Sequence, residues 1–168
     1  HKNANYQPLL SSKLSELGFY VLRIDFRGLG DSEDSRDAKV GRTIQQDVED
    51  ITTVHDFVME KELCEEICGI QLSLDAIVAH SRGVLAMFEF AWLNPGIHVP
   101  NLVNSSGRFD GQGLLQKRLE SSAEWATEGG FWCDFPRYGS TVKTWLPKAE
   151  TLSAINLDTS KFKDISTK

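Results

Sequence analysis

Residues 74–83 read Leu74-Asp75-Ala76-Ile77-Val78-Ala79-His80-Ser81-Arg82-Gly83. The part up to His80 is nearly continuous in apolar residues, which is typical of a strand covered on both faces. From Arg82 to Trp92 the chain is again apolar almost all round, over a length that favours a deeply buried helix. The stretch therefore predicts a strand that passes directly into a helix, with a single serine at the junction.

The segments on either side continue this alternation. We predict helices over residues 5–17 and 43–58 and further strands over residues 19–26 and 99–104. Thr43 and Gln46 fit a capping box at the start of the second helix, and Asp47, Glu49 and Asp50 favour its N-terminal dipole. Strands separated by helices imply right-handed crossovers. The predicted fold class is α/β, with a central, mostly parallel sheet flanked by helices.

The serine at the junction is the candidate nucleophile. A strand–turn–helix junction this tight forces Ser81 into a strained backbone conformation, and the residues two positions away pass close together. Only small residues fit there, and Ala79 and Gly83 meet that need. The turn would push the Ser81 hydroxyl above the carboxyl edge of the sheet, beside the unpaired N–H groups of the helix. We expect the backbone N–H of Arg82 to be the first oxyanion donor. The alternative is that Ser81 only caps the helix.

Two motifs together resemble the α/β-hydrolase superfamily, especially its serine-aminopeptidase-like and esterase/lipase-like branch. The first is similar to the D-x-R-G-x-G-x-S segment after that fold's fourth strand and reads Asp25-Phe26-Arg27-Gly28-Leu29-Gly30-Asp31-Ser32. The second, residues 79–83, looks like the nucleophile elbow of the family, with Ala79 where Gly is commoner. One helix and one strand separate the two motifs, as in the family. Residues 1–3 look like those just after its oxyanion loop.

The resemblance implies a division of the chain. Residues 1–108 match the hydrolase core in part, and residues 109–168 are expected to form a cap or lid. Residues 109–148 contain five glycines and seven Trp, Phe and Tyr side chains, so we expect an irregular, aromatic-rich segment. Its aromatic side chains would pack together or line an acyl pocket.

The other triad members are not assigned within the chain. The resemblance implies the order Ser, Asp or Glu, His, and we expect the acid, the base and the second oxyanion donor to lie beyond both ends of this segment of a longer protein. His80 is expected at a strand end or pocket wall, His55 on a solvated helix and His98 in a turn. Asp110 and Asp134 are expected to be solvated, and Asp75 to accept a hydrogen bond in a turn.

Composition argues against several other classes of protein. The net charge of -6 and the pI near 5.2 disfavour nucleic acid as a partner. Three cysteines do not suggest a disulfide framework. Cys64 and Cys68 are expected as free thiols rather than metal ligands. Gly28-Leu29-Gly30 lacks the third glycine and the helix of a dinucleotide site. No apolar run reaches transmembrane length. We expect no cofactor, no metal and a cytoplasmic protein.

The sequence thus predicts a serine hydrolase that cleaves a carboxylic ester, thioester or amide through an acyl-enzyme on Ser81. The substrate would be a small molecule or a short acyl or peptide compound. The alternative is a non-catalytic binding or scaffold protein of the same fold. The isolated 168 residues are expected to show no turnover.

Overall fold

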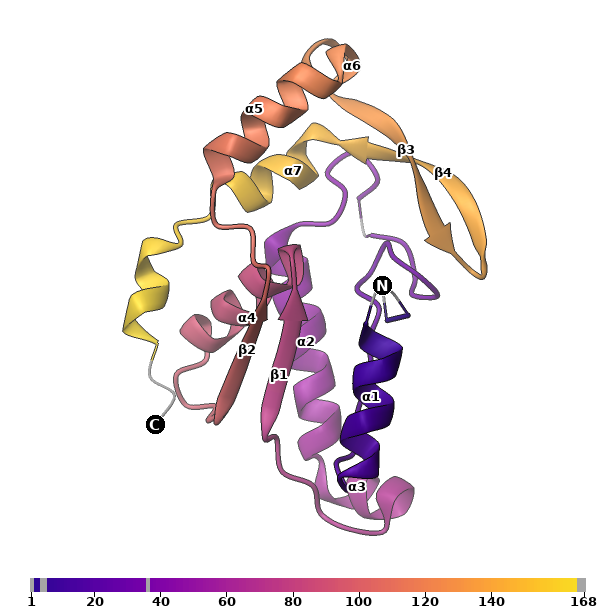
Figure 1. The fold of residues 1–168 in the computed structure, drawn as a ribbon, viewed down its shortest axis with the longest axis vertical. Coiled ribbons are helices and arrows are strands. Elements are labelled where there is room, and N and C mark those ends of the chain that lie inside the picture. Colours follow the sequence, from indigo (N-terminus) through magenta and orange to yellow (C-terminus); the bar gives the residue numbers. More distant parts are fainter. Residues whose placement is uncertain (1, 4–5, 36, 166–168) are drawn as a thin grey trace.

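The computed structural model describes residues 2–3, 6–35 and 37–165. Within them the fold is mixed α/β with two small sheets. Strands β1 (Ala76–His80) and β2 (Asn101–Ser105) pair in parallel, and β3 (Gly130–Arg137) and β4 (Ser140–Pro147) form an antiparallel hairpin. The carboxyl ends of β1 and β2 point toward the end of the molecule that holds the hairpin (Figure 1).

The predicted junction at Ser81 is confirmed as a strand followed at once by a helix. β1 ends at His80 and helix α4 (Arg82–Leu93) begins at Arg82. α4 crosses back to β2, whose residues pair with β1 from Ala76 opposite Asn101 to His80 opposite Ser105. The result is one parallel pair joined by a helix, which is the unit that the sequence predicted for this region.

The core lies between α4 and helix α2 (Ile44–Met59). It comprises residues of α2, α4 and α7 (Lys148–Ile155) together with Val99, namely Ile44, Val48, Ile51, Leu85, Ala86, Phe90 and Ala154. Ile77 of β1 and Leu102 of β2 pack against it. Full burial of an aliphatic or aromatic side chain contributes roughly 1.5–3 kcal/mol, so this cluster holds the two helices on one face of the parallel pair.

The start of α2 is capped as the sequence predicted, in part. The hydroxyl of Thr43 accepts the backbone N–H of Gln46 at 3.1 Å. The return bond of a capping box is absent from the described residues, where Gln46 Oε1 is buried without a hydrogen-bond partner.

Two predictions about strands are wrong. Residues 19–26, which follow helix α1 (Gln7–Glu16), join no sheet within the described part of the chain. No neighbouring strand is present there to pair with them, and Tyr20 and Leu22 remain exposed. β1 is also not covered on both faces. Val78 is 40% exposed and its partner Val103 is 44% exposed, because the described helices cover the opposite face of the pair.

The segment after residue 109 is more regular than predicted. It contains α5 (Gly111–Ser121), α6 (Ala123–Thr127), the hairpin, α7 and a 3-10 helix, η1 (Ser160–Asp164). Two of its glycines serve as turns, since Gly129 and Gly139 have φ of +80° and +75° at the start of the hairpin and at its tip. Two of the aromatic side chains pair across the strands, with the rings of Trp132 and Trp145 5.4 Å apart.

Two further observations complete the fold. Helix α3 (Lys61–Cys68), which the sequence did not predict, ends at Gly69 in the left-handed conformation. Cys64, Cys68 and Cys133 are free thiols. Across the described ranges, every helix is too short or too polar to cross a membrane.

Candidate active site at the junction of β1 and α4

Ser81 has a backbone conformation that non-glycine residues rarely adopt. Its φ is 55° and its ψ is -120°, outside both the helical and the extended regions. The Ser81 N–H donates to the carbonyl oxygen of Ser105 at 3.1 Å, and its own carbonyl accepts the N–H of Val84 at 3.2 Å. Strain of this kind persists only where the surroundings enforce it, and it is concentrated at functional sites.

The hydroxyl of Ser81 does not cap the helix that follows it. Ordinary N-cap side chains accept a backbone N–H of the first turn. Thr43, Asp110 and Ser122 all do so in this molecule, each with the N–H three residues later. Ser81 makes no such bond with α4. The cap alternative therefore does not describe this serine, and its hydroxyl stays available for other partners.

The two small neighbours pass close together, as the sequence predicted. A Cβ atom added at Gly83 would lie 3.9 Å from Cβ of Ala79 and 3.8 Å from the ring of Phe26. These are ordinary contact distances, so the site accommodates alanine at either position but leaves little room for a longer side chain. The departure at Ala79 from the commoner glycine is thus sterically compatible with the turn.

Arg82 offers its backbone N–H in the first turn of α4, where no carbonyl of the same helix can accept it. Its side chain extends away to three other segments. The guanidinium donates to Asp47 Oδ2 at 3.0 Å, to the carbonyl oxygens of Glu150 and Arg42 at 3.0 and 2.7 Å, and to the hydroxyl of Ser153 at 3.3 Å. This network was not predicted from the sequence.

Asp47 lies at the centre of a buried ion cluster. Its side chain is 0% exposed, and Nε of Arg42 lies 3.1 Å from its other oxygen, at an angle that is not that of a hydrogen bond. Burial raises the pKa of Asp47, and the positive charges of Arg42 and Arg82 oppose that shift. Burial also lowers the pKa of Arg42, against the nearby charge of Asp47. Asp47 was interpreted as a helix-dipole residue; the structure gives it two cationic partners instead.

The motif of residues 25–32 forms a turn organised by one carboxylate. Asp25, whose side chain is 2% exposed, accepts the N–H groups of Lys2 and Asp31 and lies 3.4 Å from the ammonium of Lys2. Burial alone would raise the pKa of Asp25, but these donors outweigh it and hold the pKa below its ordinary value. Gly30 has φ of +54°, and a Cβ there would lie 2.0 Å from Asp25 Oδ2. The glycine is therefore required by the close approach of this carboxylate.

A second part of the same motif ties the turn to α2. Arg27 donates its backbone N–H to Asp50 at 2.9 Å and its guanidinium to both Asp50 and Glu49 at 2.6 and 3.0 Å. Phe26 lies beside the elbow, as the contact with Gly83 shows. The motif thus places Phe26 next to the elbow at Ser81. The charged side chain of Arg27 fixes this part of the motif to α2.

None of the histidines in the described part of the chain hydrogen bonds to Ser81. The ring of His80 packs edge-on against Tyr6, with centroids 6.1 Å apart, in keeping with a wall residue. His55 lies on α2, where residues such as Asp56 and Phe57 are exposed as predicted, but its own side chain is only 16% exposed and its ring lies 6.0 Å from the ring of Phe90. His98 is exposed. His1 lies outside the described residues.

The predicted carboxylates behave as structural residues. Asp110 caps α5 through the N–H of Gly113 at 2.8 Å, and Asp134 is exposed on β3. Asp75 accepts the hydroxyl of Ser73 at 3.1 Å, the turn role that the sequence indicated. These contacts give none of the three a direct link to the elbow.

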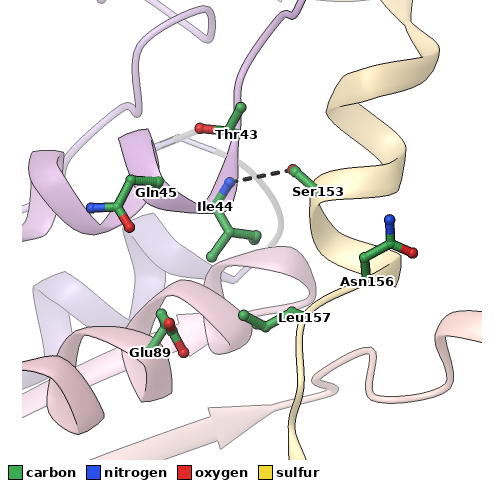
Figure 2. A pocket seen from close by; sticks show the side chains of 7 residues that line it. All are labelled: Thr43, Ile44, Gln45, Glu89, Ser153, Asn156 and Leu157. Atoms are coloured by element: carbon green, nitrogen blue, oxygen red, sulfur yellow. Dashed lines mark hydrogen bonds between the residues drawn. The ribbon is translucent and has the colours of Figure 1, made fainter.

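Two hollows in the described part of the structure do not have Ser81 among their lining residues. Figure 2 shows the first, of about 260 Å³, where Ser153 of α7 accepts the N–H of Ile44 at 3.3 Å. Its other lining residues are Thr43, Gln45, Glu89, Asn156 and Leu157. The second, of about 350 Å³, lies between the hairpin tip and the turn at Asp31. Tyr138 lines it, whereas Trp125 is wholly buried below Lys148.

Comparison with known proteins identifies a relative in Saccharomyces cerevisiae (strain ATCC 204508 / S288c). This is the uncharacterized protein YDL057W, which is 44% identical over 169 residues, corresponding to 98% of this chain and 52% of the relative. The chain spans about half the length of that relative. No protein-family model matches the chain, and no solved structure is similar to it.

Proposed function

We propose that the protein is a serine hydrolase of the α/β-hydrolase fold in which Ser81 is the nucleophile. The observation that carries the proposal is the backbone of Ser81, with φ of 55° and ψ of -120°, between a parallel strand and a helix that its hydroxyl does not cap. A plain cap would need neither the strain nor the two small neighbours at positions 79 and 83.

The proposed reaction is acyl transfer. The hydroxyl oxygen of Ser81 attacks the carbonyl carbon of an ester, thioester or amide and gives its proton to a histidine base. The backbone N–H of Arg82 and the N-terminal dipole of α4 stabilise the tetrahedral oxyanion. Collapse breaks the bond to the leaving group, which takes the proton from the histidine. Water then attacks the acyl-serine and releases the carboxylic acid, restoring the hydroxyl of Ser81.

The base, its acid partner and the second oxyanion donor are proposed to come from residues outside this chain. The half-length match to the yeast relative is compatible with that division. In this proposal residues 1–108 belong to the hydrolase core, and the elements from α5 to η1 form the cap over its carboxyl edge. The substrate is a small molecule or a short acyl or peptide compound.

Turnover by the full-length protein tests the proposal. The substrates are a short-chain p-nitrophenyl ester, the matching acyl thioester and an aminoacyl p-nitroanilide. Ser81→Ala should abolish turnover of whichever is cleaved. Ser106→Ala is the matched control, because Ser106 also has a positive φ, of 56°, just after the neighbouring strand, but no helix begins there. Equal loss in both variants would contradict the assignment to Ser81.

The competing function is a non-catalytic binding or scaffold role on the same fold. It is favoured by the lack of any hydrogen bond between Ser81 and the described histidines, and by two pockets that do not include Ser81. A scaffold would turn over none of the three substrate classes, and Ser81→Ala would leave its partner binding unchanged.

A further inference from the structure

The guanidinium of Arg82 connects the elbow to two helices that are distant in sequence. It binds the carboxylate of Asp47 on α2, and it binds the Glu150 carbonyl and the Ser153 hydroxyl on α7. The residue next to the candidate nucleophile is therefore fixed from the core side and from the cap side at once.

Asp47 is the fixed point of this arrangement. It is fully buried, and a carboxylate is costly to remove from water unless cationic partners compensate. Arg42, the second partner, is also tied to α7, since its backbone N–H donates to Glu150 Oε2 at 3.0 Å. Arg42, Asp47, Arg82 and Glu150 together carry two positive and two negative charges.

The contacts of the Arg82 guanidinium also restrain the backbone of Arg82, because the side chain and the peptide N–H belong to the same residue. A displacement of the Arg82 backbone, which would move its peptide N–H, the proposed oxyanion donor, would also pull on the guanidinium and its contacts with four acceptors. Oxyanion donors are effective only when they are held in place before the charge develops. The four hydrogen bonds of the Arg82 guanidinium provide such a restraint. Among their acceptors, Asp47 is the one that carries a negative charge.

We propose that Asp47 is a positioning residue for the chemistry of Ser81, which holds the Arg82 N–H in place through the Arg82 guanidinium and anchors α7 beside the elbow. The proposal rests on the proposed function and deepens it. Asp47 touches no reacting atom, so its contribution should appear only through Arg82.

A double-mutant cycle on the full-length protein tests this dependence. Asp47→Asn removes the charge at nearly constant size, and Arg82→Lys keeps the charge but loses the planar fork. The measurement is the second-order rate constant for labelling of Ser81 by a fluorophosphonate. Each single variant should label roughly tenfold to a hundredfold more slowly, the range expected when a reacting group is misplaced. The double variant should label no more slowly than the slower single variant.

Glu89→Gln is the matched control. Like Asp47, Glu89 is a buried carboxylate. It lies on α4, is 8% exposed and pairs with Lys161 at 2.8 Å rather than with Arg82. The Glu89→Gln variant should be less stable than the wild type, but Ser81 in this variant should be labelled with the wild-type rate constant. Wild-type labelling of folded Asp47→Asn, or effects that multiply in the double variant, would overturn the proposal. If Asp47→Asn fails to fold, Arg82→Lys probes the same ion pair from the other side, and wild-type labelling of that variant overturns it equally.

Hydrogen exchange provides a readout that needs no chemistry at Ser81. In Asp47→Asn, amides of residues 81–86 and 148–155 should exchange faster than in Glu89→Gln, because both segments lose the same anchor. Unchanged exchange in both segments overturns the positioning role. Absence of labelling in the wild type would overturn the proposed function instead, and the exchange result would still decide whether Asp47 anchors the elbow and α7.

Discussion

The backbone N–H of Ser81 donates to the carbonyl oxygen of Ser105 at 3.1 Å, so the residue that turns the chain into α4 also makes a hydrogen bond to the end of β2. The strand side of the elbow is thereby held by β2, while its helix side is held by the contacts of Arg82. These restraints maintain a backbone conformation that a serine would not adopt alone.

Relief of this strain should be measurable. Ser81→Gly removes the side chain that makes φ of 55° unfavourable, whereas Ser81→Ala keeps a Cβ and the strain. We expect the glycine variant to be about 1 kcal/mol more stable than the alanine variant, although both lack the hydroxyl. Urea unfolding of the two proteins measures the difference. A glycine variant less stable than the alanine variant would mean that the backbone of Ser81 is not strained.

The turn after Asp25 should be intolerant of a side chain at Gly30. A Cβ there would lie 2.0 Å from the Asp25 carboxylate, at φ of +54°, so Gly30→Ala should cost about 3 kcal/mol from strain and displaced contacts. Gly139→Ala is the control, with φ of +75° and open space around the new Cβ, and should cost only about 1 kcal/mol. The free energies of unfolding give both values. Equal losses of unfolding free energy in the two variants would show that the Asp25 carboxylate moves aside without cost when a Cβ is added at Gly30.

Asp25 should also make stability depend on pH in acid. Its pKa is lowered in the folded state, so its contribution is fully present above the unfolded value near 3.8 and is lost as pH falls through the folded pKa. Unfolding of the wild type and Asp25→Asn is compared from about pH 6 down to about pH 2. The stability advantage of the wild type should shrink below about pH 4. A difference that stays constant over this range would contradict the lowered pKa.

Loss of the buried carboxylate of Asp47 should lower the free energy of unfolding more than loss of an exposed carboxylate on the same helix, α2. Asp47→Ala leaves Arg42 and Arg82 without their shared counter-charge, and breaking a buried pair of this kind costs about 3–5 kcal/mol. Glu49→Gln removes a carboxylate that is 37% exposed and paired with Arg27, and should cost less than about 1 kcal/mol. Chemical denaturation distinguishes the two. Similar losses of unfolding free energy in the two variants would show that burial does not determine how much Asp47 contributes to stability.

The sequence was sufficient for the local features of the elbow. The apolar runs on either side of Ser81 and the small residues at positions 79 and 83 are local signals, and the strand, the helix and the close approach all follow from them. Residues 19–26 carry a similar β-rich signal, yet a strand also needs a neighbour, which no local pattern supplies. The hairpin β3–β4 was missed because its glycines were interpreted as breaks in regular structure.

The ion cluster could not have been predicted from one sequence. Asp47 stands in the first turn of a helix, where a carboxylate ordinarily favours the dipole and faces water. Its partner Arg82 is 35 residues later, and the contacts on α7 are a further 68 and 71 residues along. Only the packing of α2, α4 and α7 brings these groups together. The one sequence feature that marks the cluster is the arginine beside the elbow serine.

Fluorophosphonate labelling of the full-length protein tests the central claim most directly. The probe forms a covalent adduct with an activated serine, and mass spectrometry of the digested protein identifies the residue. We predict an adduct on Ser81 in the wild type and in Ser106→Ala, and none in Ser81→Ala. Equal labelling of the wild type and Ser81→Ala, an adduct on another residue, or no labelling of the wild type would contradict the claim that Ser81 is the nucleophile.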